Sequence, residues 1–291
     1  MRNHLSLKSA GPISTRPGIR NYPSFKEHEN QKVKKPKALV LCGDGINCEL
    51  ESEYALQLAG FEPSLVHTSE LLSEPGMLKQ YQMLVIPGGF SFGDEIASGK
   101  VLAIKLKDHV QELLAEFIDS GSLLLASCNG FQVIVQMGLL PSVKANQTHV
   151  SSLVHNTPTR FTNHWVTLDV DPATTCKFLT GLKTIELPIR HGEGRLVVEP
   201  SHVASVKSQA CLRYHTDVNG SFDRIAALTN AQGNVFGLMP HPEAFVRWTQ
   251  HPAWTERFGK QLASSDEDFR SNGVPDGLAI FKNAAQAILK G

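Results

Sequence analysis

The sequence lacks a long uninterrupted hydrophobic run, although 41% of its 291 residues are hydrophobic. Its longest apolar stretches are broken by Lys, Gly or Asn well before the roughly 18 residues that a membrane-spanning helix needs. No apolar segment with a cleavage site follows Met1. We therefore expect neither a membrane protein nor a secreted one, and no membrane partner. The length is sufficient to bury the core of one large domain or of two small ones.

Cysteines are few, and their spacing suggests no pairing. The chain has five, an odd number, and none forms a CxxC pair; they are Cys42, Cys48, Cys128, Cys176 and Cys211. A disulfide framework and a zinc site are therefore not indicated. We expect reduced thiols in a cytoplasmic protein and no bound metal.

Acidic residues are scarce at the start of the chain. Residues 1–37 hold nine Lys and Arg against Glu27 and Glu29, a net charge of +7, so the formal charge of zero leaves −7 on residues 38–291. The first segment is rich in Pro, Gly, Ser and Asn and has no hydrophobic period, which predicts a disordered basic arm. A solvated tail, a tether and an organellar transit peptide all stay open as its role. We expect no nucleic-acid partner.

From Ala38 onward, short apolar runs alternate with helical patterns. The runs at residues 38–42, 63–68, 83–87 and 122–127 predict strands, and a last strand is predicted in "NVFGLMP". Helices are predicted at residues 47–59 and 101–118 and directly after Cys128. This rhythm predicts an α/β domain at residues 38–291: a single doubly wound, mostly parallel sheet with helices on both faces.

Cys128 lies where the strand at residues 122–127 changes into a helix. A sharp strand-to-helix turn exposes its central side chain and needs small neighbours, and Ala126 and Gly130 are small. The carboxyl ends of parallel strands are also where reactive groups gather. Cys128 is therefore a candidate nucleophile, and a buried structural cysteine is the alternative.

The loop Gly88–Asp94 follows the strand at residues 83–87 and belongs to the same edge of the sheet. It lacks the GK[ST] of a P-loop and a GxGxxG spacing, which disfavours a phosphate-binding loop. The loop is therefore a second candidate element of the site beside Cys128, and an ordinary surface turn is the alternative.

A candidate base follows the last strand in His241-Pro242-Glu243. In extended chain, residues two apart point the same way, so Glu243 can hold the ring of His241 in one tautomer. A cysteine nucleophile needs such a base, oriented by a third group. A solvated His–Glu pair at the end of a strand is the alternative.

Several segments, in order, resemble a known family. They are "GINCELESEYALQLAGFEP", "VIPGGFSFGDEIASGKVLA", "CNGFQVIVQMGLLP", "HGEGR" and "NGSFDRIAALTNAQGNVFGLMPHPE". Together they are similar to the glutaminase subunits of phosphoribosylformylglycinamidine synthase, which are class I, triad-type glutamine amidotransferases of purine biosynthesis. The resemblance spans roughly residues 37–290 and implies a flavodoxin-like fold. It implies that the chain hydrolyses glutamine to glutamate and ammonia, and that ammonia passes to a synthetase subunit.

The resemblance also implies roles for individual residues. The nucleophile falls on Cys128, the base on His241 and the orienting carboxylate on Glu243. We expect the oxyanion to be bound by backbone N–H groups, one after the nucleophile and one in the glycine loop. These donors are assigned to Asn129 and to Gly89 and Phe90, and contacts to the amino acid end of glutamine to Gln132 and Asn156.

Partners and departures complete these expectations. No cofactor is expected on this chain, MgATP is expected on the synthetase, and a small third subunit is possible in the complex. Ala244 replaces the Arg usual in the family, Ala126 replaces the usual Gly, and residues 251–272 read as an insertion. His191 and Glu193 are expected at the synthetase interface, in an inter-domain contact or in a solvated loop, and not in catalysis. A glutaminase for another acceptor, or a degenerate amidotransferase acting as a binding or scaffold subunit, stays open.

Overall fold

The computed structural model describes residues 34–94, 96–141, 150–263 and 273–290 of the chain. In this part of the chain the strands form one nine-stranded sheet and a separate two-stranded antiparallel sheet of β5 and β8. The strands are β1 (Lys37–Cys42), β2 (Glu62–His67), β3 (Met83–Ile86), β4 (Leu123–Ser127), β5 (Ser151–Val154), β6 (Thr162–Val170), β7 (Thr184–His191), β8 (Arg195–Val198), β9 (Ala210–Tyr214), β10 (Ile225–Thr229) and β11 (Val235–Leu238).

The nine-stranded sheet has a parallel half and an antiparallel half. Its order is β2-β1-β3-β4-β11-β10-β9-β6-β7. Neighbours from β2 to β11 run parallel, and neighbours from β11 to β7 run antiparallel. The predicted doubly wound α/β sheet is confirmed. The strands β6, β7, β9 and β10, which extend it as an antiparallel half, were not among the predicted elements.

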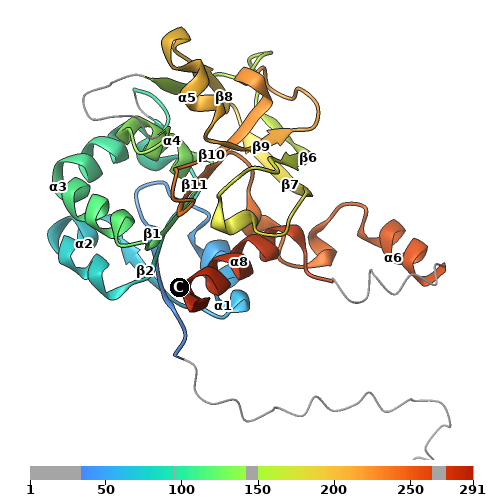
Figure 1. Ribbon diagram of the computed structural model, residues 1–291, viewed down its shortest axis with the longest axis horizontal. Coiled ribbons are helices and arrows are strands. Elements are labelled where there is room, and N and C mark those ends of the chain that lie inside the picture. The colour runs from blue at the N-terminus through green and yellow to red at the C-terminus, as the bar shows by residue number, and fades with distance from the viewer. Residues whose placement is uncertain (1–33, 95, 142–149, 264–272, 291) are drawn as a thin grey trace, which may run out of the picture. The chain divides into compact units, whose positions relative to one another are not determined.

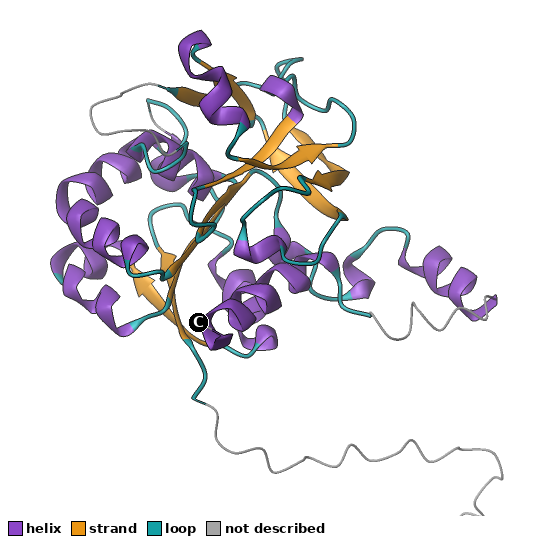
Figure 2. Cartoon of the chain, viewed as in Figure 1, coloured by secondary structure: helices purple, strands orange, loops and turns teal. Residues whose placement is uncertain are grey.

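Helices cover both faces of the parallel half (Figures 1 and 2). Side chains of α3 and α4 enter the hydrophobic core on one face, and side chains of α1 and α8 enter the core on the other. The described helices are α1 (Glu49–Ala59), α2 (Thr68–Ser73), α3 (Lys100–Asp119), α4 (Asn129–Met137), α5 (Val203–Lys207), α6 (Trp254–Ala263) and α8 (Asp276–Lys290).

Alternate residues of each parallel strand supply the two cores. In β1, Leu39 and Leu41 belong to the core that includes α3 and α4, whereas Ala38 and Val40 belong to the core that includes α1 and α8. Successive side chains of a strand point to opposite faces, so a strand covered on both sides is apolar throughout. This continuous apolar character is why the predicted strands match β1, β3 and β4 to within one residue at each end.

One glycine ends helix α1, and another lets helix α4 pack closely on the sheet. Helix α1 ends at Gly60, which has the left-handed φ of 95° expected of a helix-terminating glycine. In α4, a Cβ atom on Gly130 would lie 2.0 Å from the backbone oxygen of Ile86 at the end of β3. Only a glycine lets α4 approach the sheet this closely.

Three neighbouring strands position the site. The parallel strands β3, β4 and β11 are adjacent in the sheet, and Gly88, Cys128 and His241 follow their carboxyl ends. Strand β7 is four places beyond β11 in the sheet order, yet its Pro188 oxygen accepts a hydrogen bond of 2.9 Å from the His241 N–H. The antiparallel half therefore curves back, so that its last strand meets the end of the parallel half.

Two predicted segments lie partly outside the described residues. Of the predicted arm at residues 1–37, only residues 34–37 are described, and β1 already begins at Lys37. Of residues 251–272, the part up to residue 263 is described and contains α6. None of the helices in the described ranges is long and apolar enough to cross a membrane.

Candidate active site

Cys128 occupies the predicted turn between β4 and α4. It is the N-cap residue of α4, with φ 50° and ψ −108°, and its N–H donates to the Leu238 oxygen of β11 over 2.8 Å. A positive φ on a non-glycine residue is a strained conformation that the surroundings must maintain. Ala126, which replaces the family's usual glycine, lies in β4 and is not among the residues with positive φ. That replacement is therefore accommodated.

His241 and Glu243 form a buried pair. The Nδ1 atom of His241 lies 2.6 Å from Oε1 of Glu243, whose side chain is 2% exposed. The pair forms as predicted, but across a 3-10 turn over Pro242–Ala244 and not in extended chain. Burial opposes the charged ring, yet the Glu243 carboxylate and then the Cys128 sulfur together raise the pKa of His241 well above its usual range. The Nε2 atom is buried and has no hydrogen-bond partner among the described residues, which leaves it for proton transfer.

Three reactive side chains lie next to Gly88. A Cβ atom on Gly88 would lie 2.8 Å from Cε1 of His241, 3.3 Å from Cβ of Cys128 and 3.3 Å from Sγ of Cys48. All three side chains therefore meet around one glycine. The thiol of Cys128 itself donates a long hydrogen bond of 3.7 Å to the backbone oxygen of Arg190.

Cys48 is a second thiol at the site that the sequence analysis did not identify. Its Sγ lies 3.9 Å from Nδ1 of His241, on the side of the ring that Glu243 also contacts. Among the described residues, Cys48, His241 and Glu243 are the group able to hold a metal ion, with ligand atoms within 4.8 Å of one another. An ion bound there would occupy the Nδ1 atom of His241 that Glu243 contacts. The edge-of-sheet argument used for Cys128 applies equally to the residues that follow β1, and it offered a signal for Cys48.

The glycine loop departs from the expectation at Phe90. The Phe90 N–H donates to the Gly45 oxygen over 2.8 Å, so in this structure it is not available to an oxyanion. The Gly89 N–H finds no acceptor among the described residues. A Cβ on Gly89 would lie 2.4 Å from the Gly45 oxygen, which explains the glycine. Of the two predicted loop donors, Gly89 alone has its N–H free.

Asn129 joins the glycine loop to α4. Its Oδ1 accepts the Ser91 N–H at 3.1 Å, and its Nδ2 donates to Asp94 at 3.0 Å and to Oε1 of Gln132 at 2.9 Å. The backbone N–H of Asn129 is in the first turn of α4, where such groups have no acceptor within the helix. It therefore has no acceptor within α4, and its role as an oxyanion donor stays a prediction.

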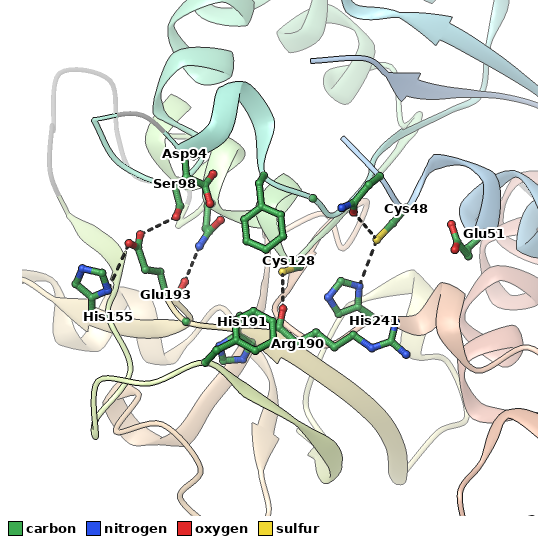
Figure 3. A pocket seen from close by; sticks show the side chains of 16 residues that line it. Cys48, Glu51, Asp94, Ser98, Cys128, His155, Arg190, His191, Glu193 and His241 are labelled. Atoms are coloured by element: carbon green, nitrogen blue, oxygen red, sulfur yellow. Dashed lines mark hydrogen bonds and ion pairs between the residues drawn. The ribbon is translucent and has the colours of Figure 1, made fainter. Parts of the chain in front are cut away.

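These residues surround a cavity of about 500 Å³ (Figure 3). Of the predicted site residues, Cys128, His241, Gly89, Phe90 and Gln132 line it. Figure 3 places Cys128 between Cys48 and His241 on one side and Glu193, Ser98 and Asp94 on the other. The exposed rings of Phe90 and Phe161 also belong to the lining.

Asn156, the second predicted substrate contact, is not among the residues that line the cavity. Its side chain is 2% exposed and is occupied by the chain itself. The Nδ2 atom donates to the His191 oxygen over 2.9 Å, and Oδ1 accepts the Gly194 N–H over 3.0 Å. Asn156 therefore holds the turn after β7 in place.

The turn after β7 brings His191 and Glu193 to the cavity, where the sequence analysis did not place them. Burial, followed by the charges of His241 and His164, lowers the pKa of His191 to about 4. Its Nδ1 lies 3.2 Å from Oδ1 of Asn156, an acceptor, so Nδ1 carries a proton and donates. Nothing local in the sequence marks this turn as part of the site, because the curvature of the antiparallel half brings it there.

Comparisons with known proteins agree with this geometry. Residues 35–286 match the CobB/CobQ-like glutamine amidotransferase domain. The chain is 36% identical over 266 residues to the phosphoribosylformylglycinamidine synthase subunit PurQ of Dehalococcoides mccartyi, covering 87% of this chain and 98% of that protein. It is 39% identical over 216 residues to the PurQ subunit of Thermotoga maritima, covering 73% and 89%.

Among solved structures, one chain of the PurLQS structure from Thermotoga maritima matches with a TM-score of 0.64 and 32% identity, over 87% of this chain and 99% of that chain. A putative GMP synthase subunit from Thermoplasma acidophilum, at 14% identity and a TM-score of 0.51, covers 88% of this chain and 95% of that chain and shares the fold. The family match over most of the chain and the identity to curated subunits lead to one assignment. The chain belongs to the PurQ family of phosphoribosylformylglycinamidine synthase subunits, within the glutamine amidotransferases.

Proposed function

We propose that this chain hydrolyses glutamine at Cys128 and delivers the ammonia to the synthetase subunit of phosphoribosylformylglycinamidine synthase. The observation that carries the proposal is the meeting of Cys128 and the buried His241–Glu243 pair around Gly88, at the ends of adjacent parallel strands. A thiol, an imidazole and a carboxylate in this order provide a nucleophile, its base and the group that orients the base.

The reaction proceeds through a thioester. The Cys128 sulfur attacks the side-chain amide carbon of glutamine, and the resulting oxyanion is bound by the N–H groups of Gly89 and Asn129. His241 then gives a proton to the departing ammonia, and water hydrolyses the glutamyl thioester. Losing one oxyanion donor raises the barrier by about 3 kcal/mol.

Gln132 is the substrate contact kept in the proposal, since it lines the cavity one helical turn after Cys128. No cofactor is assigned to this chain, and MgATP is used by the synthetase. The name of the Thermotoga maritima assembly, PurLQS, supports a complex of more than two kinds of subunit. We place the reaction in the cytoplasm, where a thiol nucleophile stays reduced.

The test is glutamate release from glutamine by the purified chain, with and without the synthetase, formylglycinamide ribonucleotide and MgATP. Wild type in the complete mixture is expected to release glutamate, and Cys128→Ala is expected to release none. We further expect turnover to rise on adding the partner, because the synthetase orders the Gly89–Phe90 loop. Glutamate release by Cys128→Ala at the wild-type rate would refute the assigned nucleophile, and no release by wild type would favour a binding or scaffold subunit.

A further inference from the structure

The cavity has a reactive end and an acidic end. At the reactive end lie Cys128 and His241, with the exposed Glu51 beside Cys48, and at the other end lie the carboxylates of Glu193 and Asp94 (Figure 3). Glutamine has a matching asymmetry, because its amide must reach the sulfur while its α-ammonium and α-carboxylate lie at the far end of the molecule. A positive ammonium group entering a partly buried cavity needs an anionic partner.

Asp94 is already engaged. Its Oδ1 accepts a hydrogen bond of 3.0 Å from Nδ2 of Asn129. Burial raises the pKa of Asp94, against the effect of hydrogen bonds from Ser98 and Gly99. This carboxylate therefore serves to hold the glycine loop on α4.

Glu193 keeps acceptor capacity. Its Oε2 accepts a hydrogen bond of 2.7 Å from the Ser98 hydroxyl, and its Oε1 lies 3.4 Å from Nδ1 of the exposed His155. Its side chain is 27% exposed and lines the cavity. A carboxylate offers about four lone-pair positions, so both oxygens can still accept from an ammonium group.

The position of Glu193 relative to the nucleophile is fixed by two contacts. Gln132 lies four residues after Cys128 on α4, and its Nε2 donates to the Glu193 backbone oxygen over 2.5 Å. On the other side, Asn156 holds the Gly194 N–H at 3.0 Å. The backbone at Glu193 is thus tied to α4 and to Asn156, and the Ser98 hydroxyl orients its carboxylate, before any substrate enters, which lowers the entropic cost of binding.

We propose that Glu193 binds the α-ammonium group of glutamine and thereby makes the site selective for amides that carry this charge. The inference rests on the proposed function, since it assumes that glutamine is the substrate. The Ser98 hydroxyl orients the carboxylate, and Gln132 holds the Glu193 backbone oxygen from α4. Glu193 is thus a specificity-determining residue and takes no part in proton transfer.

The experiment compares glutamine with 4-carbamoylbutanoate, which is glutamine without its α-amine, in the complete complex. In Glu193→Gln the side chain keeps its shape and its acceptor for Ser98 but loses its charge. We expect kcat/KM for glutamine to fall about tenfold or more, mainly through KM, because a charge-assisted hydrogen bond is lost. The kcat/KM for 4-carbamoylbutanoate is expected to stay within about twofold, so the preference for glutamine collapses.

Glu112→Gln is the matched control, because it removes the same charge from an exposed residue of α3 that does not line the cavity. It is expected to keep the wild-type preference. An unchanged preference in Glu193→Gln would overturn the proposal, and so would a parallel loss for both amides, which indicates a purely structural role.

Calorimetric binding to Cys128→Ala separates this inference from the proposed function. If wild type releases no glutamate, the function fails, while glutamine binding to Cys128→Ala that is lost in the Cys128→Ala/Glu193→Gln double variant still supports Glu193. Glutamine binding that is equal in both variants, or absent from both, contradicts the role of Glu193.

Discussion

Gly88 packs directly against His241: a Cβ atom there would lie 2.8 Å from Cε1 of the imidazole. Gly88 does not have a positive φ, so an alanine is compatible with its backbone and tests space alone. Gly88→Ala must displace the ring from the sulfur, and a misplacement of this kind costs about 100-fold in kcat. We expect kcat to fall by that order while KM for glutamine changes little.

The kinetics of the complete complex check this, with Gly76→Ala as the control because no atom lies within 4 Å of a Cβ there. A Gly88→Ala enzyme with the kcat of wild type would show that His241 tolerates the shift or takes no part in the rate-limiting step.

Glu243→Gln is expected to lower the pKa of His241. Burial alone disfavours the protonated ring, and the Glu243 carboxylate is the largest influence that raises its pKa. The alkaline limb of kcat/KM, where the imidazolium loses its proton, should therefore move to lower pH. The rate should fall roughly 10²- to 10⁴-fold, because the tautomer is no longer fixed.

The same variant has a stability signature. A histidine whose pKa is raised in the folded state contributes stability below its unfolded pKa of about 6.5, and this contribution is lost as pH rises through the folded pKa. Denaturant titrations should thus show Glu243→Gln most destabilised at acidic to neutral pH and least destabilised in strong alkali. A constant difference from wild type across this range would contradict the buried charged pair.

The strained backbone of Cys128 predicts that a glycine at this position abolishes activity but stabilises the fold. Glycine adopts a φ of 50° without strain, whereas alanine retains the strain of cysteine. Both replacements abolish the thiol, but Cys128→Gly should exceed Cys128→Ala in free energy of unfolding by about 1 kcal/mol, after the entropy that glycine adds to the unfolded chain. Denaturant unfolding of the two variants measures this difference, and equal stabilities would mean that the turn stores no strain.

His191 predicts a pH window for stability. Its pKa is lowered by burial to about 4 in the folded chain, against about 6.5 when unfolded. Between these values the unfolded state binds the extra proton, so the free energy of unfolding falls as pH drops, by up to about 3 kcal/mol. His191→Gln should lose this part of the slope, and His109→Gln, at an exposed position, should keep it. Identical slopes for wild type and His191→Gln would contradict a neutral buried ring.

The parallel half of the fold could be predicted from the sequence because the strands of this half are covered on both faces. Such strands are apolar throughout, as in β3 and β4, and are easily recognised. Strand β6 instead mixes exposed, half-buried and buried residues without a clean alternation, so no periodic signal marks it.

The residues of the candidate site also differ in whether the sequence alone could predict them. Cys128 and the His241–Glu243 pair could be predicted, since each follows a recognisable strand. The sequence could not separate the two roles open to Asn156, because a buried amide that holds a turn and an amide that binds substrate look alike in sequence. Cys48 follows the predicted strand β1 and could have been found by the argument used for Cys128, whereas Glu193 enters the site through contacts with a distant segment, which local patterns do not record.

The curvature of the sheet makes its edge strand part of the active site. The bond-breaking groups follow β4 and β11, in the middle of the sheet, while the turn that presents Glu193 follows β7, at the edge. The backbone oxygens of Pro188, Arg190 and Glu193 bond to His241, Cys128 and Gln132. A redesign for a different amide should therefore exchange side chains on this turn and keep its backbone path.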